Sequence, residues 1–201
     1  MTTRRERILA EGMRLFGEQG YAATSIAQIE EAAGLAPGSG SLYKHFRSKE
    51  ELLSAGLEQL LSSRSDTLAP LDEPAAGTTA DTTAALEAAA RAGLERMEQD
   101  RDLNRVLFRG LAAFPELLEK FGEEEIARIG KDTAEFLAGL AGAGDRHTDW
   151  EALATVLQGA TAHYWLLEDL FGAHPMGVSR ERFVNALVGL AEAGIAAPPR
   201  R

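Results

Sequence analysis

Two helix starts on either side of a glycine-rich turn restrict the fold of this chain more than any other feature. Ser25 and Gln28 have the spacing of a capping box, in which each side chain satisfies a backbone N–H of the first helical turn. Ser48 and Glu51 repeat that spacing. Between the two boxes, residues 34–46 read GLAPGSGSLYKHF, and glycine and proline at this density indicate a sharp turn. The sequence therefore predicts short helices packed closely around a turn.

Helical spacing also runs through the rest of the 201-residue sequence. A first helix is expected to end at Gly20, a second to run over about nine residues to Gly34, and a third short helix to carry Leu42 and Phe46. A fourth helix begins at the Ser48 box. Further helices are expected at 82–99, 102–113, 115–141, 149–170 and 179–193. No strand-like alternation of useful length occurs in the sequence, so we expect an all-α fold.

Charge divides the sequence unevenly. The formal net charge is −10, but residues 1–50 hold seven lysines and arginines against six acids, so residues 51–201 account for −11. Surfaces that bind phosphate need positive charge. An asymmetry of this kind suggests two segments with different partners. We therefore expect an N-terminal domain at 1–47 and a larger helical domain at 48–197.

The N-terminal pattern is that of a helix-turn-helix, in which two short helices are joined by a tight turn and braced by a longer first helix. In this motif the second short helix lies in the major groove of DNA, and the other two hold its apolar face. Leu42 and Phe46 are expected to point inward. The residues left for the groove or its phosphates are Ser39, Gly40, Ser41, Tyr43, Lys44 and His45.

Each of these residue types has a reason to lie beside DNA. Hydroxyls and backbone N–H groups bind phosphate oxygens, a lysine adds a point charge, and glycine lets the backbone approach closely. Lys49 lies in the first turn of the fourth helix, whose partly positive N-terminus favours a phosphate.

The run TSIAQIEEAAGLAPGSGSLYKHFRSKEELL resembles the DNA-binding domain of the tetracycline-repressor (TetR) family. Members of that family show a T-x-x-x-I-A-x-x-A-G turn, then an L-Y-x-H-F block and an S-K-E-x-L helix start. The resemblance implies a homodimeric transcriptional regulator, usually a repressor, that leaves a palindromic DNA operator when a small-molecule effector binds. The 1–47 domain would then bind DNA, and the 48–197 domain would bind the effector and dimerise. Matching positions imply DNA contacts at Thr24, Ser25, Ser41, Tyr43, Lys44, His45 and Lys49.

The sequence departs from the family pattern in two places. Between Gly34 and Leu42 it has about two more residues than most members, and we expect the turn to absorb them while Leu42 and Phe46 keep their anchoring role. Glu30 and Glu31 stand where alanines are common, and we expect both to face solvent, away from phosphate.

The C-terminal part offers two further sets of candidates. An effector cavity, with plain core or interface packing as the alternative, could be lined by Met97, Phe108, Phe114, His163 and Trp165. The last two helices are expected to meet their symmetry mates in a four-helix bundle, with packing inside the chain as the alternative. The small and apolar residues that suit this packing are Ala154, Leu157, Ala160, Thr161, Tyr164, Leu187, Leu190, Ala191 and Gly194.

Other classes of function find little support in the sequence. There is no cysteine, His147, His163 and His174 lack metal-ligand spacing, and no catalytic motif has its required flanks, so we expect neither an enzyme nor a metal or cofactor. No segment is apolar enough for a signal peptide or a membrane span, and a cytoplasmic protein without a membrane partner is expected. The alternatives are an all-α enzyme or a protein-interaction module with a regulator-like N-terminus, and salt-dependent DNA binding would separate them from a regulator.

Overall fold

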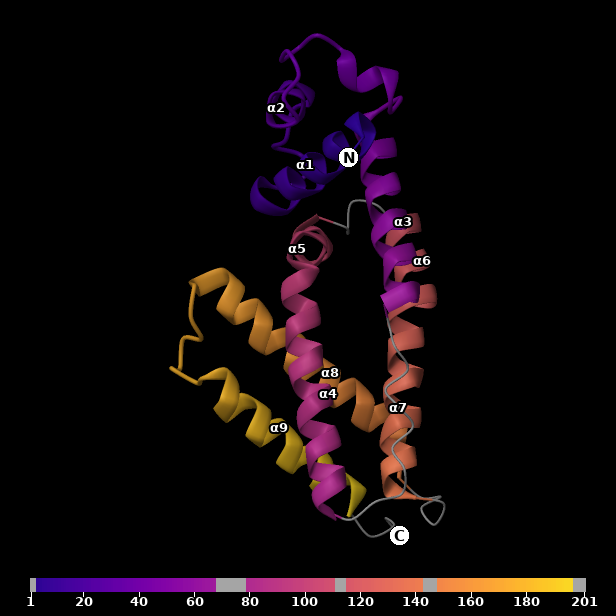
Figure 1. Ribbon diagram of the computed structural model, residues 1–201, viewed down its shortest axis with the longest axis vertical. Helices are drawn as coiled ribbons and strands as arrows, with labels where there is room; N and C mark the ends of the chain where they lie inside the picture. The colour runs from indigo at the N-terminus through magenta and orange to yellow at the C-terminus, as the bar shows by residue number, and fades with distance from the viewer. Residues whose placement is uncertain (1–2, 68–78, 111–114, 143–147, 197–201) are drawn as a thin grey trace. The chain divides into compact units, whose positions relative to one another are not determined.

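The computed structural model describes residues 3–67, 79–110, 115–142 and 148–196, and within these ranges every regular element is a helix (Figure 1). The prediction of an all-α fold is confirmed. The α-helices are α1 (Arg4–Gln19), α2 (Ile26–Ala32), α3 (Lys49–Thr67), α4 (Thr79–Gln99), α5 (Arg101–Gly110), α6 (Pro115–Phe121), α7 (Ala127–Ala141), α8 (Trp150–Phe171) and α9 (Arg180–Ile195). A 3₁₀ turn covers Ser41–Lys44, and a π-helical turn covers Gly122–Ile126.

Contacts divide the chain into two compact units. The first unit holds Met1–Leu68 and Asp100–Gly122, with α1, α2, α3, α5 and α6; the second holds Ala69–Gln99 and Glu123–Arg201, with α4, α7, α8 and α9. Packing thus groups α3, α5 and α6 with the N-terminal helices. The boundary expected after residue 47 concerns a division between DNA binding and effector binding, and it stays a prediction.

The capping box at the start of α2 is confirmed. The Ser25 hydroxyl accepts a hydrogen bond from the backbone N–H of Gln28 at 3.3 Å, and the Gln28 side chain accepts one from the N–H of Ser25 at 2.7 Å. At α3 only half of the expected box forms, because Ser48 accepts from the N–H of Glu51 at 3.0 Å while the Glu51 carboxylate binds the N–H of Arg47. The first turns of α2 and α3 therefore each have a backbone N–H that is bonded to a capping side chain.

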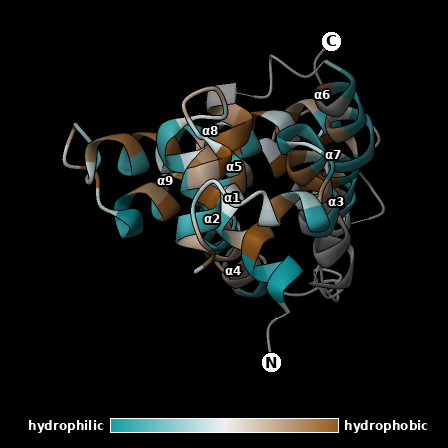
Figure 2. Ribbon diagram, turned by 90° about the horizontal axis from the view of Figure 1, so that it is seen from above, coloured by the Kyte–Doolittle hydropathy of each residue, from teal (hydrophilic) through white to brown (hydrophobic). Residues whose placement is uncertain are grey.

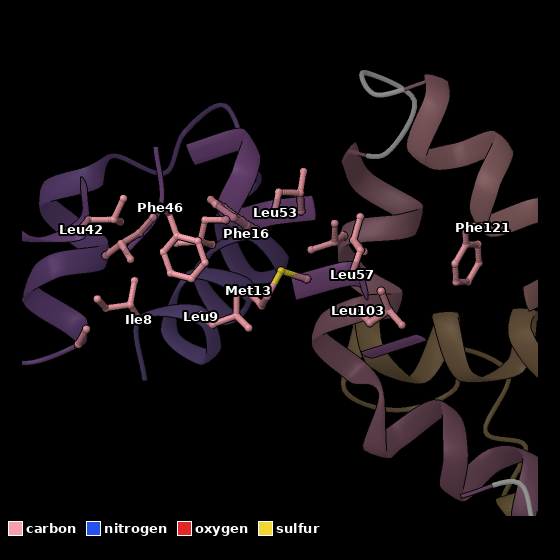
Figure 3. Close-up of a cluster of buried hydrophobic side chains, with 14 residues drawn as sticks. Ile8, Leu9, Met13, Phe16, Leu42, Phe46, Leu53, Leu57, Leu103 and Phe121 are labelled. Atoms are coloured by element: carbon pink, nitrogen blue, oxygen red, sulfur yellow. The ribbon is translucent and has the colours of Figure 1, made fainter. Parts of the chain in front are cut away.

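The core of the first unit gathers apolar side chains from α1, α2, the 3₁₀ turn, α3, α5 and α6 (Figure 3). Its buried members include Ile8, Leu9, Met13, Phe16, Leu42, Phe46, Leu53, Leu57, Leu103 and Phe121. α1 runs through this core and packs on both α3 and α5. At Gly17 the approach of α5 is so close that an added Cβ would lie 3.0 Å from the carbonyl oxygen of Asp102.

The second unit packs α8 between α7 and α4, and α9 joins α4 and α8. α8 and α9 run side by side as a hairpin (Figure 1), and both mix hydrophobic and hydrophilic residues along their length (Figure 2). Five of the residues considered for the dimer bundle lie buried in this unit's own core, namely Ala154, Leu157, Tyr164, Leu187 and Ala191. For these five the alternative, packing inside the chain, is the correct interpretation.

One expected helix contains a π-helical turn. The sequence predicts a continuous helix over 115–141, and this range is helical throughout, with the π-helical turn Gly122–Ile126 between α6 and α7. In this turn Glu125 is buried, and its carboxylate pairs with the guanidinium of Arg128 at 2.9 Å. Apolar periodicity does not register one extra residue in a turn, so the sequence predicts the helix but not the π-helical turn within it.

The close approach of α1 and α5 predicts a specific loss of stability. Replacing Gly17 by alanine should lower the free energy of unfolding by about 1–3 kcal/mol, because the new Cβ meets backbone atoms of Asp102 that cannot rotate away. Urea unfolding followed by circular dichroism measures this. Gly130→Ala on α7 is the matched control, since its Cβ meets nothing within 4 Å, and it should be neutral or stabilising by up to about 1 kcal/mol.

Candidate functional site

The candidate site is the 3₁₀ turn Ser41–Lys44, here called the recognition turn. The third helix predicted from the sequence is thus a single turn. Gly34, Gly38 and Gly40 all have φ near +70° (+72°, +72° and +71°), where side-chain-bearing residues are strained, so the chain before the turn cannot continue a right-handed helix. Residues 33–40 carry no regular helix, and the expectation that this loop absorbs additional residues relative to the family stays a prediction.

Two side chains hold the recognition turn from beneath. Leu42 and Phe46 have exposed fractions of 0% and 1% and belong to the core of the first unit (Figure 3). The backbone N–H groups of His45 and Phe46 both donate to the carbonyl of Leu42, at 2.9 and 3.0 Å, which ends the turn. The predicted anchoring role of Leu42 and Phe46 is confirmed.

The polar residues of the turn lie on its outer side. Tyr43 is 56% exposed, Lys44 is exposed, and His45 is half-buried. Ser39 is exposed, and its hydroxyl lies 2.8 Å from the hydroxyl of half-buried Ser41. Hydroxyls, an imidazole and an ammonium are thereby offered together on one short segment, a set that suits phosphate oxygens.

The backbone amides at the start of the turn are already bonded within the protein. The N–H of Ser41 donates to the Ser39 hydroxyl at 3.3 Å, and the N–H of Tyr43 donates to the carbonyl of Gly40 at 3.1 Å. The N–H of Leu42 donates to Oε1 of Glu30 at 3.0 Å. Anion binding at this turn must therefore come from its side chains.

Glu30 corrects one expectation from the sequence. Glu31 is exposed, as predicted, but Glu30 has an exposed fraction of 0% and faces the recognition turn. A buried amide needs an acceptor, and the carboxylate supplies one to Leu42 where the loop does not. The only signal in the sequence was an acid where the family pattern has alanine.

The predicted contact residues at the start of α2 are occupied within the protein. Thr24 is 1% exposed, and its hydroxyl donates to the carbonyl of Gly20 at 2.9 Å while lying 3.3 Å from Nε2 of Gln19. Ser25 is exposed, and its hydroxyl caps α2. DNA contacts at these two positions stay predictions.

Lys49 ties α3 to the connection between α1 and α2. Its ammonium donates to the carbonyls of Tyr21 and Thr24 at 2.7 and 2.9 Å and lies 4.1 Å from the centroid of the Tyr21 ring. Burial lowers the pKa of the Lys49 ammonium below its ordinary value. The phosphate contact expected of Lys49 stays a prediction, beside the structural role that these bonds give it.

Arg5 is a residue of this region that the sequence analysis did not single out. It is exposed on α1, and its guanidinium carbon lies 4.8 Å from the centroid of the Phe46 ring, a cation–π distance. The contact brings a second positive charge beside the end of the recognition turn. Helical spacing could show only that Arg5 is on the surface of its helix.

The residues proposed for an effector cavity are distributed differently from the expectation. Trp165 is buried and its indole N–H donates to Glu98 at 3.3 Å, whereas His163, two residues earlier on α8, is exposed. Met97 is half-buried on α4, Phe108 is exposed on α5 in the other unit, and Phe114 lies outside the described residues. The effector set stays a prediction.

A polar cluster joins the ends of α8 and α9. The hydroxyl of Tyr164 lies 3.0 Å from Glu168 and 2.9 Å from the carbonyl of Val178, and Arg180 binds Glu168 at 2.8 Å. The Tyr164 ring is stacked on that of His174, with centroids 5.0 Å apart. Burial, and then the hydrogen bond to Glu168, raise the pKa of Tyr164 to about 12.

The described part of the chain offers neither a metal site nor a membrane-spanning helix. Its side chains form no group of three or more histidines and acids that could hold a metal ion. None of its helices combines the length and apolar character needed to span a bilayer.

Comparisons with known proteins match the N-terminal part. Residues 8–55 fit the family model described as bacterial regulatory proteins, tetR family. The HTH-type transcriptional regulator YerO of Bacillus subtilis (strain 168) is 35% identical over 77 residues, which are 38% of this chain and 26% of YerO. The HTH-type transcriptional repressor KstR2 of Mycolicibacterium smegmatis is 37% identical over 59 residues, 29% of this chain and 28% of KstR2. The matched region spans about a quarter of these curated relatives.

Solved structures resemble the whole chain. A TetR-like transcriptional regulator from Rhodococcus sp. RHA1 has a TM-score of 0.71 at 21% identity, with 98% of each chain covered. A TetR-family regulator from Mesorhizobium loti MAFF303099 has a TM-score of 0.71 at 21% identity, covering 96% of this chain and 95% of that one. Likeness at this identity establishes the fold.

The raised pKa of Tyr164 predicts a loss of stability at high pH. The folded state holds this proton more tightly than the unfolded state, whose tyrosine titrates near 10, so the contribution is complete below pH 10 and disappears as the pH rises to about 12. Over that window the unfolding free energy of the wild type should fall by up to about 3 kcal/mol more than that of Tyr164→Phe. Urea unfolding at several pH values measures the difference. Tyr43→Phe, which removes the hydroxyl of an exposed tyrosine, is the matched control.

Proposed function

Because the chain belongs to the tetR family of bacterial regulatory proteins, we propose that it is a DNA-binding regulator of transcription whose recognition turn reads an operator. The observation that carries the proposal is the two-sided nature of this turn. Leu42 and Phe46 are buried to within 1%, and Tyr43 and Lys44 between them project outward. Lys44 has no ion pair within the described ranges, which leaves its charge available to a phosphate.

The DNA-facing set comprises Ser39, Gly40, Ser41, Tyr43, Lys44 and His45, with Thr24, Ser25 and Lys49 as contacts at the helix starts. Arg5 extends it, since the Phe46 ring holds its guanidinium beside the turn. The remainder of the chain is strongly acidic and would repel the duplex, which favours approach by the N-terminal residues.

We further propose a two-fold homodimer formed by α8 and α9. Both helices have a stripe of small and apolar residues that their own unit leaves exposed: Ala152, Val156 and Gly159 on α8, and Ala186, Gly189, Leu190 and Ala193 on α9. The α8 stripe continues to His163 at helical spacing, so this histidine suits an interface better than a cavity. An added Cβ at Gly159 or Gly189 would meet nothing within 4 Å, so a partner helix has room to approach closely.

The remaining parts of the proposal follow the family. A small-molecule effector would bind in the C-terminal part, with Met97 and Trp165 among its candidate contacts, and release the DNA. The protein would act as a repressor in the cytoplasm. The mechanism requires only that the effector favour a state in which the two recognition turns no longer match the half-site spacing.

DNA binding is tested with a duplex enriched from a random pool, by fluorescence anisotropy at about 50 and about 200 mM salt. If about six phosphates are neutralised, the affinity should fall on the order of 10³-fold between the two. Lys44→Ala should reduce the slope of log affinity against log salt by about one, and Tyr43→Ala should weaken binding at both salt concentrations. Lys131→Ala, an equal change of charge on an exposed residue of α7, is the control.

DNA affinity that does not change with salt concentration would contradict the proposal of a DNA-binding regulator. So would an affinity that neither Lys44→Ala nor Tyr43→Ala changes. Either result would favour the protein-interaction module or the enzyme as the explanation of the chain. An enrichment that returns no duplex would have the same meaning.

The proposed interface predicts that Leu190→Glu yields a monomer. Leu190 is 46% exposed, and a carboxylate there would be desolvated in a two-fold contact where it also meets its own symmetry mate. Sedimentation equilibrium measures the mass. Ile126→Glu, at a residue of similar exposure in the π-helical turn, should remain dimeric, and a Leu190→Glu dimer as tight as the wild type would place the interface elsewhere.

A further inference from the structure

We propose that Glu30 is the positioning residue of the recognition turn, setting its orientation toward DNA through a buried carboxylate–amide bond. The inference deepens the proposed DNA-binding function and rests on it. Glu30 lies on α2 and does not itself face the duplex, so it acts through Leu42.

Glu30 holds both ends of the glycine-rich loop. Its backbone carbonyl accepts from the N–H of Leu35 at 2.7 Å, at the start of the loop. Its carboxylate Oε1 accepts from the N–H of Leu42 at 3.0 Å, where the loop enters the recognition turn. One residue of α2 thereby fixes both ends of the segment from Leu35 to Leu42, which contains Gly38 and Gly40 at positive φ.

Apolar packing alone leaves the orientation of the turn weakly determined. Burial of Leu42 and Phe46 stabilises any arrangement that keeps the two side chains in the core, because the hydrophobic effect has no direction. A hydrogen bond to one amide is directional, and with a charged acceptor in a buried setting it is among the stronger ones. The bond to Glu30 therefore specifies how the outer side chains of the turn are aimed.

The cost of burying Glu30 supports a positioning role over a purely stabilising one. Its second oxygen, Oε2, is buried and has no hydrogen-bond partner among the residues that the structure describes. A carboxylate bonded through one oxygen gains less than it loses by leaving water when only stability is counted. The negative charge also lies beneath a turn proposed to approach phosphates, so charge alone would make its removal favourable for DNA binding.

These opposing effects allow charge and position to be separated by substitution. Glu30→Ala removes both the acceptor and the charge, Glu30→Asp keeps the charge but is one methylene too short to reach Leu42, and Glu30→Gln keeps a carbonyl acceptor at full reach without the charge. Glu31→Gln, the same loss of charge on the exposed neighbour, is the control.

The first readout is amide hydrogen exchange of Leu42, followed by NMR in the full chain without DNA. Glu30→Ala and Glu30→Asp should accelerate exchange roughly tenfold to hundredfold, the effect of losing a hydrogen bond to a charged acceptor. Glu30→Gln should stay within about threefold of the wild type, and Glu31→Gln should match it. Glu30→Asp keeps the test open if the alanine variant does not fold.

The second readout is affinity for the enriched duplex. Glu30→Ala and Glu30→Asp should bind roughly tenfold more weakly, while Glu30→Gln and Glu31→Gln bind as tightly as the wild type or more tightly. The inference would be overturned if the Leu42 amide exchanged at the wild-type rate in Glu30→Ala and Glu30→Asp. It would also be overturned if DNA affinity depended on the charge at residue 30 and not on the length of its side chain. If the wild type binds no duplex, the proposed function fails, and the exchange of Leu42 still decides whether Glu30 positions the turn.

Discussion

Burial of Leu42 and Phe46 is the interaction on which the candidate site depends. A four-residue 3₁₀ turn has too few internal hydrogen bonds to persist alone. Burying a leucine and a phenylalanine contributes about 1.5–3 kcal/mol each, enough to hold so short a segment against the core of the first unit. That core also contains α5, far along the sequence, whose Leu103 and Val106 are buried in it. The exposed polar residues thus rest on packing that involves α5 as well as the helix-turn-helix segment.

Lys44 and Lys49 are the same residue type, but their surroundings give them different roles. Lys44 is exposed on the recognition turn, whereas the ammonium of Lys49 is held by the carbonyls of Tyr21 and Thr24 and by the face of an aromatic ring. Burial lowers the pKa of Lys49, and its bonds order the approach to α2. The charge of Lys49 therefore helps to fix the scaffold, and the charge of Lys44 is the one that can approach a duplex without breaking a contact.

Local features were predictable from the sequence, and features that depend on packing between segments were less so. The α2 capping box, the buried pair Leu42 and Phe46 and most helix ranges follow from spacing over a few residues. The bond from Glu30 to Leu42 was not predictable, because it spans twelve residues and needs the path of the loop. On α8 the limit is different: Leu157 and Val156 are adjacent and apolar, and periodicity cannot say which of two apolar faces enters the core.

The polar cluster at the α8–α9 hairpin explains how the exposed faces of these two helices can keep a fixed arrangement. Glu168 near the end of α8 binds Arg180 at the start of α9, and Arg180 also lies 3.8 Å from Glu98 of α4. Tyr164 adds a bond to the carbonyl of Val178, just before α9. These contacts cross from helix to helix, so they fix the angle of the hairpin more than the stability of either helix. An isologous interface needs the same two surfaces at the same angle in each copy, and a hairpin free to open would offer a different face in every molecule. The proposed dimer therefore depends on polar bonds inside each subunit before any contact between subunits forms.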